Sequence, residues 1–278
     1  MIKFLKDFMK SLWIISILLT IPTLLFVDFT KNIIWNNWTY YFIIILLISL
    51  IYWIIRTLPL KNINIKIKNK LNVIIKYWDL FSEKGIIVIP VNEYFDTIVD
   101  DEIISKNTIH WQFINKYFLW DTRELDNKIK IELNNIESIE KNNSRKKWKK
   151  NKYKLWTSIK IRLNNEQVAI LIVLSKFNSN NTAYIKRWYS YNINIEFQNF
   201  FILMLEWIYK YSQWKNVNIS LIWSWLSWLP LDKQKNLEYI LFLIYLYSWI
   251  LKDRNELIQI ILHKDNKKEI SLNKINTF

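Results

Sequence analysis

Glycine is almost absent from the chain. One glycine occurs in 278 residues, where average usage of about 7% would give roughly 19, and 16 tryptophans are present instead. Several tryptophans stand beside Asp, Asn, Ser or Lys at apparent segment ends, where glycine is common; they lie in YWDLF (77–81), LWDTRE (119–124), SQWKN (212–216) and YSWILKD (247–253). We therefore interpret many tryptophans as UGA codons that the source organism translates as glycine. The alternative is a truly tryptophan-rich chain with interfacial aromatic anchors.

Cysteine is absent and histidine is rare. The lack of cysteine excludes disulfides and thiolate metal sites. The two histidines, His110 and His263, are too few for a His-based zinc site, so we expect no metal and no other cofactor. No set of residues indicates a catalytic centre.

Basic residues outnumber acidic ones, with 39 Lys and Arg against 24 Asp and Glu and a net charge of +15. Such a charge is compatible with binding to nucleic acid or to an anionic membrane surface. A genome of low GC content favours Lys, Ile and Asn codons and explains the same excess, so the charge alone indicates no partner. The densest basic run, KNNSRKKWKKNKYK (141–154), has eight Lys or Arg in fourteen residues. We expect a solvated loop or a basic face toward anionic lipid there, rather than a nucleic-acid site.

Two uncharged apolar segments occupy the N-terminal region. Residues 11–27 come near the length of about 20 that spans a bilayer core, and residues 32–55 exceed it. A signal peptide would need a small-residue cleavage site, and buried core helices would show an amphipathic period, so we expect a two-helix transmembrane hairpin over 1–56. Both outer flanks are basic and the link holds only Lys31, which predicts a multi-pass protein of the bacterial inner membrane with both termini cytoplasmic. A linker over 57–70 and a cytosolic domain over 71–278 would follow.

The cytosolic part alternates expected strands with expected helices. Strands are predicted at 71–77, 85–91, 157–163, 167–174, 217–222 and 256–262. Helices are predicted at about 107–118, 190–210 and 232–250; the second has an apolar stripe of Phe197, Phe200, Phe201, Met204, Leu205 and Ile208. This alternation indicates an α/β domain with a mixed sheet between helices. Ligands of such sheets bind at the carboxyl ends of the strands, where LIWSWLSWLP (221–230) is placed.

Several stretches resemble macro domains when glycine is written for tryptophan. LIWSWLSWLP becomes LIGSGLSGLP, which looks like the phosphate-binding loop of macro domains, and IIKYWDLF (74–81) looks like the start of their ligand site. GIIVIPVNEYFDTIVDDEIISKNTIHWQFINKYF (85–118) and ILIVLSKFNSNNTAYI (170–185) closely resemble the macro domain of Thoeris antiphage defence effectors. The resemblance covers about 71–263, and a two-span N-terminus is similar to the membrane-bound branch of these effectors.

The resemblance implies a ligand site for an ADP-ribose-like nucleotide. Asp79 would accept from the adenine amine, Asn92 would contact the distal ribose, and His110 and Trp111 would open the helix that faces the diphosphate. The second phosphate loop would comprise Trp223, Ser224, Trp225, Leu226, Ser227 and Trp228. A diphosphate needs backbone N–H donors at close range, from glycine loops and helix N-termini, so tryptophan side chains translated as written would fill the cleft.

Each of these residues also has an ordinary structural interpretation. Asp79 is a turn-former, Asn92 could cap a turn, and Glu93 and Asp96 could be plain loop charges. Their order along the chain, with strands between them, favours a ligand site.

Three function classes remain. In the first, which the resemblance implies, the macro domain senses an ADP-ribose-derived signal made by a TIR-domain partner. Binding then changes the packing or assembly of a homo-oligomer that disrupts membrane lipid, so the protein is a sensor and no enzyme. The second is a membrane-tethered ADP-ribosyl hydrolase. The third is a basic membrane adaptor for nucleic acid, which would bind with a steep salt dependence.

Overall fold

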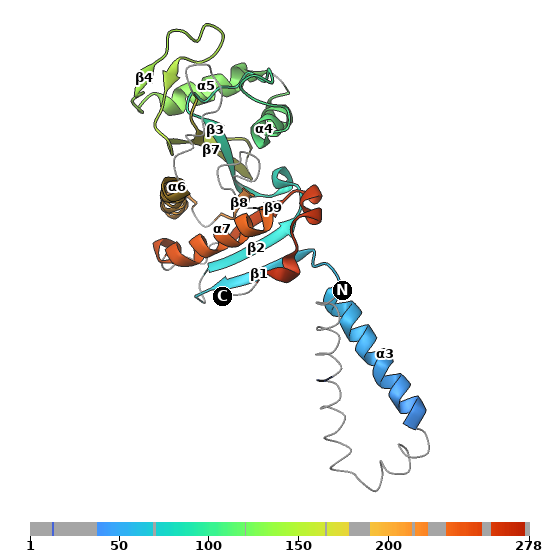
Figure 1. Cartoon of the computed structure of the whole chain (residues 1–278). Coiled ribbons are helices and arrows are strands. Elements are labelled where there is room, and N and C mark those ends of the chain that lie inside the picture. Colours follow the sequence, from blue (N-terminus) through green and yellow to red (C-terminus); the bar gives the residue numbers. More distant parts are fainter. Residues whose placement is uncertain are drawn as a thin grey trace. The chain divides into compact units, whose positions relative to one another are not determined.

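The protein is represented by a computed structural model that describes residue 13 and residues 38–68, 71–119, 121–164, 166–177, 190–212, 215–221, 232–251 and 257–275. The chain forms two compact units, Met1–Leu60 and Lys61–Phe278. Figure 1 shows both units, with helices and strands labelled where there is room.

The first unit contains one described helix, α3 (Trp38–Thr57), which overlaps the expected second span. The expected first span, 11–27, lies outside the described residues apart from Trp13. No helix within the described ranges is identified as long and apolar enough to cross a membrane, so the expected hairpin has no support there.

The second unit is built on a seven-stranded sheet with the order β1-β2-β9-β8-β3-β7-β6. Five neighbouring strands run parallel: β2 (Leu71–Tyr77), β9 (Leu257–Leu262), β8 (Val217–Ser220), β3 (Gly85–Asn92) and β7 (Gln167–Ser175). The edge strands β1 (Asn62–Ile67) and β6 (Ser158–Arg162) pair antiparallel with β2 and β7. The sheet is therefore mixed, as the sequence predicts, and its first strand lies inside the expected linker over 57–70. A separate small hairpin pairs β4 (Glu140–Lys141) with β5 (Asn151–Lys152).

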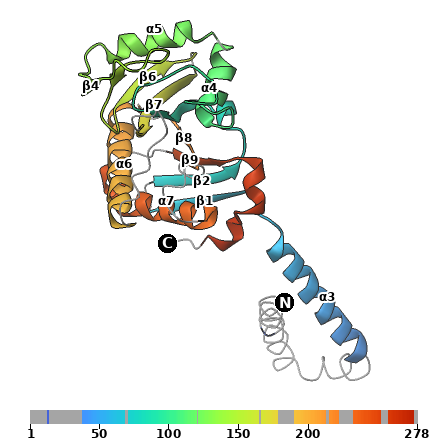
Figure 2. The ribbon, with the colours of Figure 1, turned by 45° about the horizontal axis from the view of Figure 1, so that its top comes forward.

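Helices cover both faces of the sheet (Figures 1 and 2). On one face, α6 (Ser190–Tyr211) and α7 (Lys233–Tyr247) share an apolar core with strand residues such as Ile170 and Ile260. On the other face, α4 (Ile109–Phe118) and α5 (Thr122–Leu133) share a core with residues such as Leu171 and Ile261. Because successive strand residues point to opposite faces, strands buried on both faces are apolar almost throughout. In the sequence these strands can therefore be recognised as continuous apolar runs.

Short 3-10 helices complete the second unit: η1 (Leu80–Ser82), η2 (Ser248–Leu251), η3 (Lys264–Lys268) and η4 (Leu272–Lys274). The first and third of these follow β2 and β9 directly.

The single glycine and one tryptophan have left-handed backbones. Gly85 has φ of 99°, and a Cβ there would collide with the carbonyl oxygen of Asn216, so the position requires glycine. Trp156 has φ of 72°, an unusual conformation for so bulky a residue. Trp78, Trp111 and Trp249 do not have positive φ. Trp78 continues from β2 by donating to the carbonyl oxygen of Leu262, and Trp111 lies in the first turn of α4.

Candidate ligand-binding site

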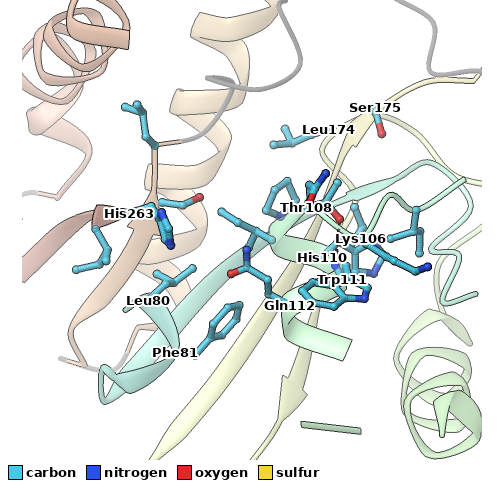
Figure 3. A pocket seen from close by; sticks show the side chains of 18 of the residues that line it. Leu80, Phe81, Lys106, Thr108, His110, Trp111, Gln112, Leu174, Ser175 and His263 are labelled. Carbon is cyan, nitrogen blue, oxygen red and sulfur yellow. Dashed lines mark hydrogen bonds between the residues drawn. The ribbon is translucent and has the colours of Figure 1, made fainter. Parts of the chain in front are cut away.

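A cavity of about 960 Å³ lies at the carboxyl ends of the five parallel strands. Each strand contributes a residue at or just beyond its end: Trp78, Asn92, Ser175, Ser220 and His263. The start of α4 forms another wall. In Figure 3 the labelled α4 side chains lie on one side of the cavity, and Leu80, Phe81 and His263 lie on the other. This is the location that parallel α/β sheets offer to ligands.

Asp79 lies in the cavity wall and caps η1. Its Oδ1 accepts from the backbone N–H of Phe81 at 3.0 Å, and its Oδ2 accepts from Ser82 Oγ at 2.7 Å and from Lys116 Nζ at 3.2 Å. Partial burial would raise the pKa of Asp79, but these hydrogen bonds outweigh it and lower the pKa below its ordinary value. The group is therefore an anionic acceptor at neutral pH.

Asn92 ends β3 at a bulge and is buried. Its Oδ1 accepts from the backbone N–H groups of Tyr94 at 3.0 Å and Asp96 at 3.3 Å, which is the turn-capping role that the sequence left open. Its amide nitrogen has no hydrogen-bond partner in the described part of the chain, so it remains available as a donor at the cavity wall.

His110 and Trp111 lie in the first turn of α4, at the cavity. The helix is capped by Thr108, whose Oγ1 accepts from the backbone N–H of Trp111 at 3.1 Å. The backbone N–H groups of Ile109 and His110 have no acceptor in the described ranges. These two donors, at the positive end of a ten-residue helix, are suited to an anionic group.

The His110 side chain is only 6% exposed, and its Nε2 has no hydrogen-bond partner among the described residues. Burial, with a smaller contribution from the positive charge of Lys149, lowers the pKa of His110 to about 3. The imidazole is therefore neutral at physiological pH.

The expected phosphate loop, Trp223 to Trp228, lies outside the described residues. Ser220 and Leu221, which precede it, line the cavity, and the buried Ser220 Oγ has no hydrogen-bond partner in the part of the chain that the structure describes.

Some residues that line the cavity were not predicted from the sequence. His263 follows β9 directly and Ser175 ends β7, so the carboxyl-edge rule applied to every expected strand would have found both. Thr108 could have been predicted as a helix N-cap, because a threonine directly before an apolar helical pattern is a common start signal. No sequence signal indicates that Lys106 lies in the wall.

The basic run 141–154 is anchored beside the cavity. Arg145 is fully buried, and its Nη2 lies 2.8 Å from Asp96 Oδ2. Its guanidinium Cζ is 3.7 Å from the ring centre of Tyr94 and 5.9 Å from that of Phe177, which lines the cavity. The expectation of a solvated basic loop or lipid-facing surface is therefore wrong for Arg145. A carboxylate and three aromatic rings, those of Tyr94, Trp148 and Phe177, take the place of water around its charge.

Glu93 and Asp96 are correspondingly not plain loop charges, since each is 1% exposed. Glu93 Oε1 accepts from the backbone N–H of Phe177 at 2.8 Å, which fixes the cavity wall beyond β7. Burial raises the pKa of Glu93, opposed by that hydrogen bond and by Lys152.

Comparisons with known proteins identify the family of the second unit. The family model described as "Thoeris protein ThsA, Macro domain" matches residues 73–263. The curated Thoeris protein ThsA of Bacillus amyloliquefaciens (strain Y2) is 38% identical over 128 residues, which are 42% of this chain and 42% of that protein. The match thus spans less than half of the relative's length.

Solved structures of the Oceanobacillus iheyensis macrodomain are also similar. A point mutant aligns with a TM-score of 0.47 and 12% identity, over 75% of this chain and 92% of the other. The same macrodomain with ADP aligns with a TM-score of 0.43 and 12% identity, over 74% and 90%.

Proposed function

Because this chain belongs to the family of Thoeris ThsA macro domains, we propose that its cavity senses an ADP-ribose-derived nucleotide signal in antiphage defence. The observation that carries the proposal is the pairing of two kinds of group in one cavity. A fixed anionic acceptor, Asp79, and the unpaired N–H groups at the start of α4 both line it. A nucleotide diphosphate offers an amine donor and an anion for these groups.

Each residue would contact a different part of the nucleotide. Asp79 accepts from the adenine amine, and the N–H groups of Ile109 and His110 donate to the diphosphate. The free amide nitrogen of Asn92 donates to a hydroxyl of the distal ribose. Trp223 to Trp228, or glycines at the tryptophan positions, would complete the phosphate contacts.

A sensor fits these residues better than a hydrolase. A general base works best with a pKa near the operating pH, and His110, with a pKa of about 3, is far from that range. Hydrogen bonds from Ser82, Phe81 and Lys116 outweigh the effect of burial and keep the pKa of Asp79 below its ordinary value, at the end of the cavity that we assign to the adenine.

The adenine contact gives the first test. Asp79→Ala should weaken the binding of ADP-ribose by about 1–3 kcal/mol, because a hydrogen bond between the ligand and a charged group is lost. Isothermal titration measures this on the full chain. Asp121→Ala is the matched control, since Asp121 also caps a helix and pairs with a basic residue, Arg123, but does not line the cavity. Equal affinities of wild type and Asp79→Ala would contradict the assignment.

We further propose that residues 11–27 and 32–55 insert into the bacterial inner membrane with both termini cytoplasmic. The support is their uncharged length in the sequence. In this proposal a TIR-domain enzyme makes the signal, and ligand binding changes a homo-oligomer so that its membrane segments disrupt the lipid bilayer and kill or arrest the cell.

The topology has a direct test, because the chain contains no native cysteine. Asp28→Cys, in the link between the two segments, should react with an impermeant thiol reagent added to intact cells from outside. A cysteine at Asn62, on the cytosolic side, is the matched control and should react only after lysis. Labelling of Asp28→Cys only after lysis would contradict the topology.

A further inference from the structure

Gln112 lines the cavity from the first half of α4. In Figure 3 its side chain extends from the helix into the space on the side of Phe81. The residue is partly buried, and its amide makes no hydrogen bond within the described residues. A glutamine amide has one acceptor oxygen and two N–H donors. A donor and an acceptor are thus free, side by side, in the wall of the site.

Helix periodicity places Gln112 on the face of α4 that meets the segment carrying Asp79. Lys116, four residues later, donates from Nζ to Asp79 Oδ2 at 3.2 Å. Tyr117 donates through its hydroxyl to the carbonyl oxygen of Phe81 at 3.3 Å. Residues four apart on a helix lie on the same face, and their side chains lean toward the helix N-terminus. Gln112 therefore lies between Asp79 and the unpaired N–H groups at the start of α4.

This position corresponds to one edge of the base in the proposed complex. Asp79 takes one hydrogen of the adenine 6-amino group, and the N–H groups of Ile109 and His110 take the diphosphate. In the anti conformation of a nucleotide, the N7 edge of the purine lies on the side of the 5′-phosphates, and the N1 edge lies on the opposite side. A residue between the two anchors therefore meets the N7 edge, where the second amino hydrogen and N7 are neighbours.

We propose that Gln112 determines base specificity by pairing with the N7 edge of adenine. Its Nε2 donates to N7 and its Oε1 accepts from the remaining 6-amino hydrogen, which is the bidentate contact that glutamine makes to adenine in DNA recognition. The inference rests on the proposed function and adds a second base contact to it. Asp79 alone would accept from any amine. Gln112 requires an amino group beside a ring nitrogen, whereas guanine and hypoxanthine have an oxygen at that position.

Helix α4 does not depend on the Gln112 side chain for its stability. Thr108 caps the helix, and the fully buried Phe113 and Ile114 pack it against the sheet. Gln112 itself donates its backbone N–H to the carbonyl oxygen of Thr108 at 3.1 Å, a contact that every residue except proline can make. Replacing the amide therefore removes no hydrogen bond within the described residues, and its loss can be measured through ligand affinity.

Titrations of ADP and 7-deaza-ADP into the full chain test the inference. Wild type should bind ADP about tenfold more tightly than 7-deaza-ADP, which has a C–H in place of the N7 acceptor. Gln112→Met, which keeps the length of the side chain, should bind ADP about tenfold more weakly and lose the preference. Gln112→Glu keeps the acceptor but has no N–H donor, so it should bind ADP no more tightly than 7-deaza-ADP. Asn115→Leu is the matched control, because Asn115 also carries an amide on α4 but does not line the cavity.

The possible failures are distinguishable. If Gln112→Met keeps the wild-type preference for ADP over 7-deaza-ADP, with or without a change in ADP affinity, Gln112 does not contact N7 and the nucleotide site still stands. Failure of wild type to bind ADP or ADP-ribose would reject the proposed function, and the inference with it. Thermal unfolding of Gln112→Met at the wild-type temperature would show that a loss of affinity is no loss of fold.

Discussion

Arg145→Met is expected to lower the free energy of unfolding by about 3–5 kcal/mol, because it leaves the carboxylate of Asp96 buried without its charged partner. Both side chains are almost completely buried, at 0% and 1% exposure. Asp96 would keep the backbone N–H of Lys149, whose nitrogen is 3.1 Å from Oδ1, as a neutral donor. Denaturant unfolding followed by circular dichroism measures the change.

A double-mutant cycle separates the ion pair from the loss of packing. Asp96→Asn in the Arg145→Met background should recover part of the stability, since it removes the uncompensated charge and keeps an acceptor for Lys149. The matched control is Arg123→Met. That arginine pairs with Asp121 at 2.7 Å but has a side chain 88% exposed, so its loss should cost far less than the loss of Arg145. Equal costs for the two arginines would contradict the buried anchor.

Acidification is expected to destabilise the protein through His110. Its pKa is about 3 when folded, against an ordinary value of 6.5. Between these values the unfolded chain binds a proton that the folded chain does not, so this contribution to stability falls as the pH falls below 6.5. At about 1.4 kcal/mol per pH unit, the loss by pH 5 is about 2 kcal/mol.

The pH dependence of the unfolding free energy is compared between variants, because carboxyl groups also bind protons as the pH falls and contribute to every curve. The unfolding free energy of His110→Gln should fall less steeply between pH 6.5 and 5 than that of wild type. His263→Gln, which removes an exposed histidine, is the matched control. Parallel curves for wild type and His110→Gln would show that His110 is not buried in a neutral state.

The strands could be predicted because each carries its own apolar run. Ile86 to Ile89 and Val168 to Leu174 are buried on both faces of the sheet, and the predicted runs match β3 and β7 within a residue. Strand β1 was missed because NINIKI places lysine and asparagine on its exposed positions, as expected of an edge strand that resembles a linker.

Helix α5 was missed for a related reason. Its sequence is mostly polar, and only Leu125, Ile129 and Leu133, spaced by four, are buried. Asp121 caps it by accepting from the N–H of Arg123, and this cap was the available signal for its start.

The cavity edge was predictable, but the contacts within it were not. Asp79, Asn92, His110 and Trp111 all line one cavity because each follows or faces a strand end. The burial of Arg145 depends on Asp96, 49 residues away, and the position of Lys116 on Asp79, 37 residues away. Pairings over such distances leave no local pattern in the sequence.

The central claim is that the cavity binds an ADP-ribose-like nucleotide and leaves it intact. Isothermal titration of ADP-ribose into the full chain, with analysis of the recovered nucleotide by mass spectrometry, tests it most directly. We predict saturable binding of one molecule per chain and recovery of unchanged ADP-ribose. Absence of saturable binding, or release of a cleaved product, would contradict the claim.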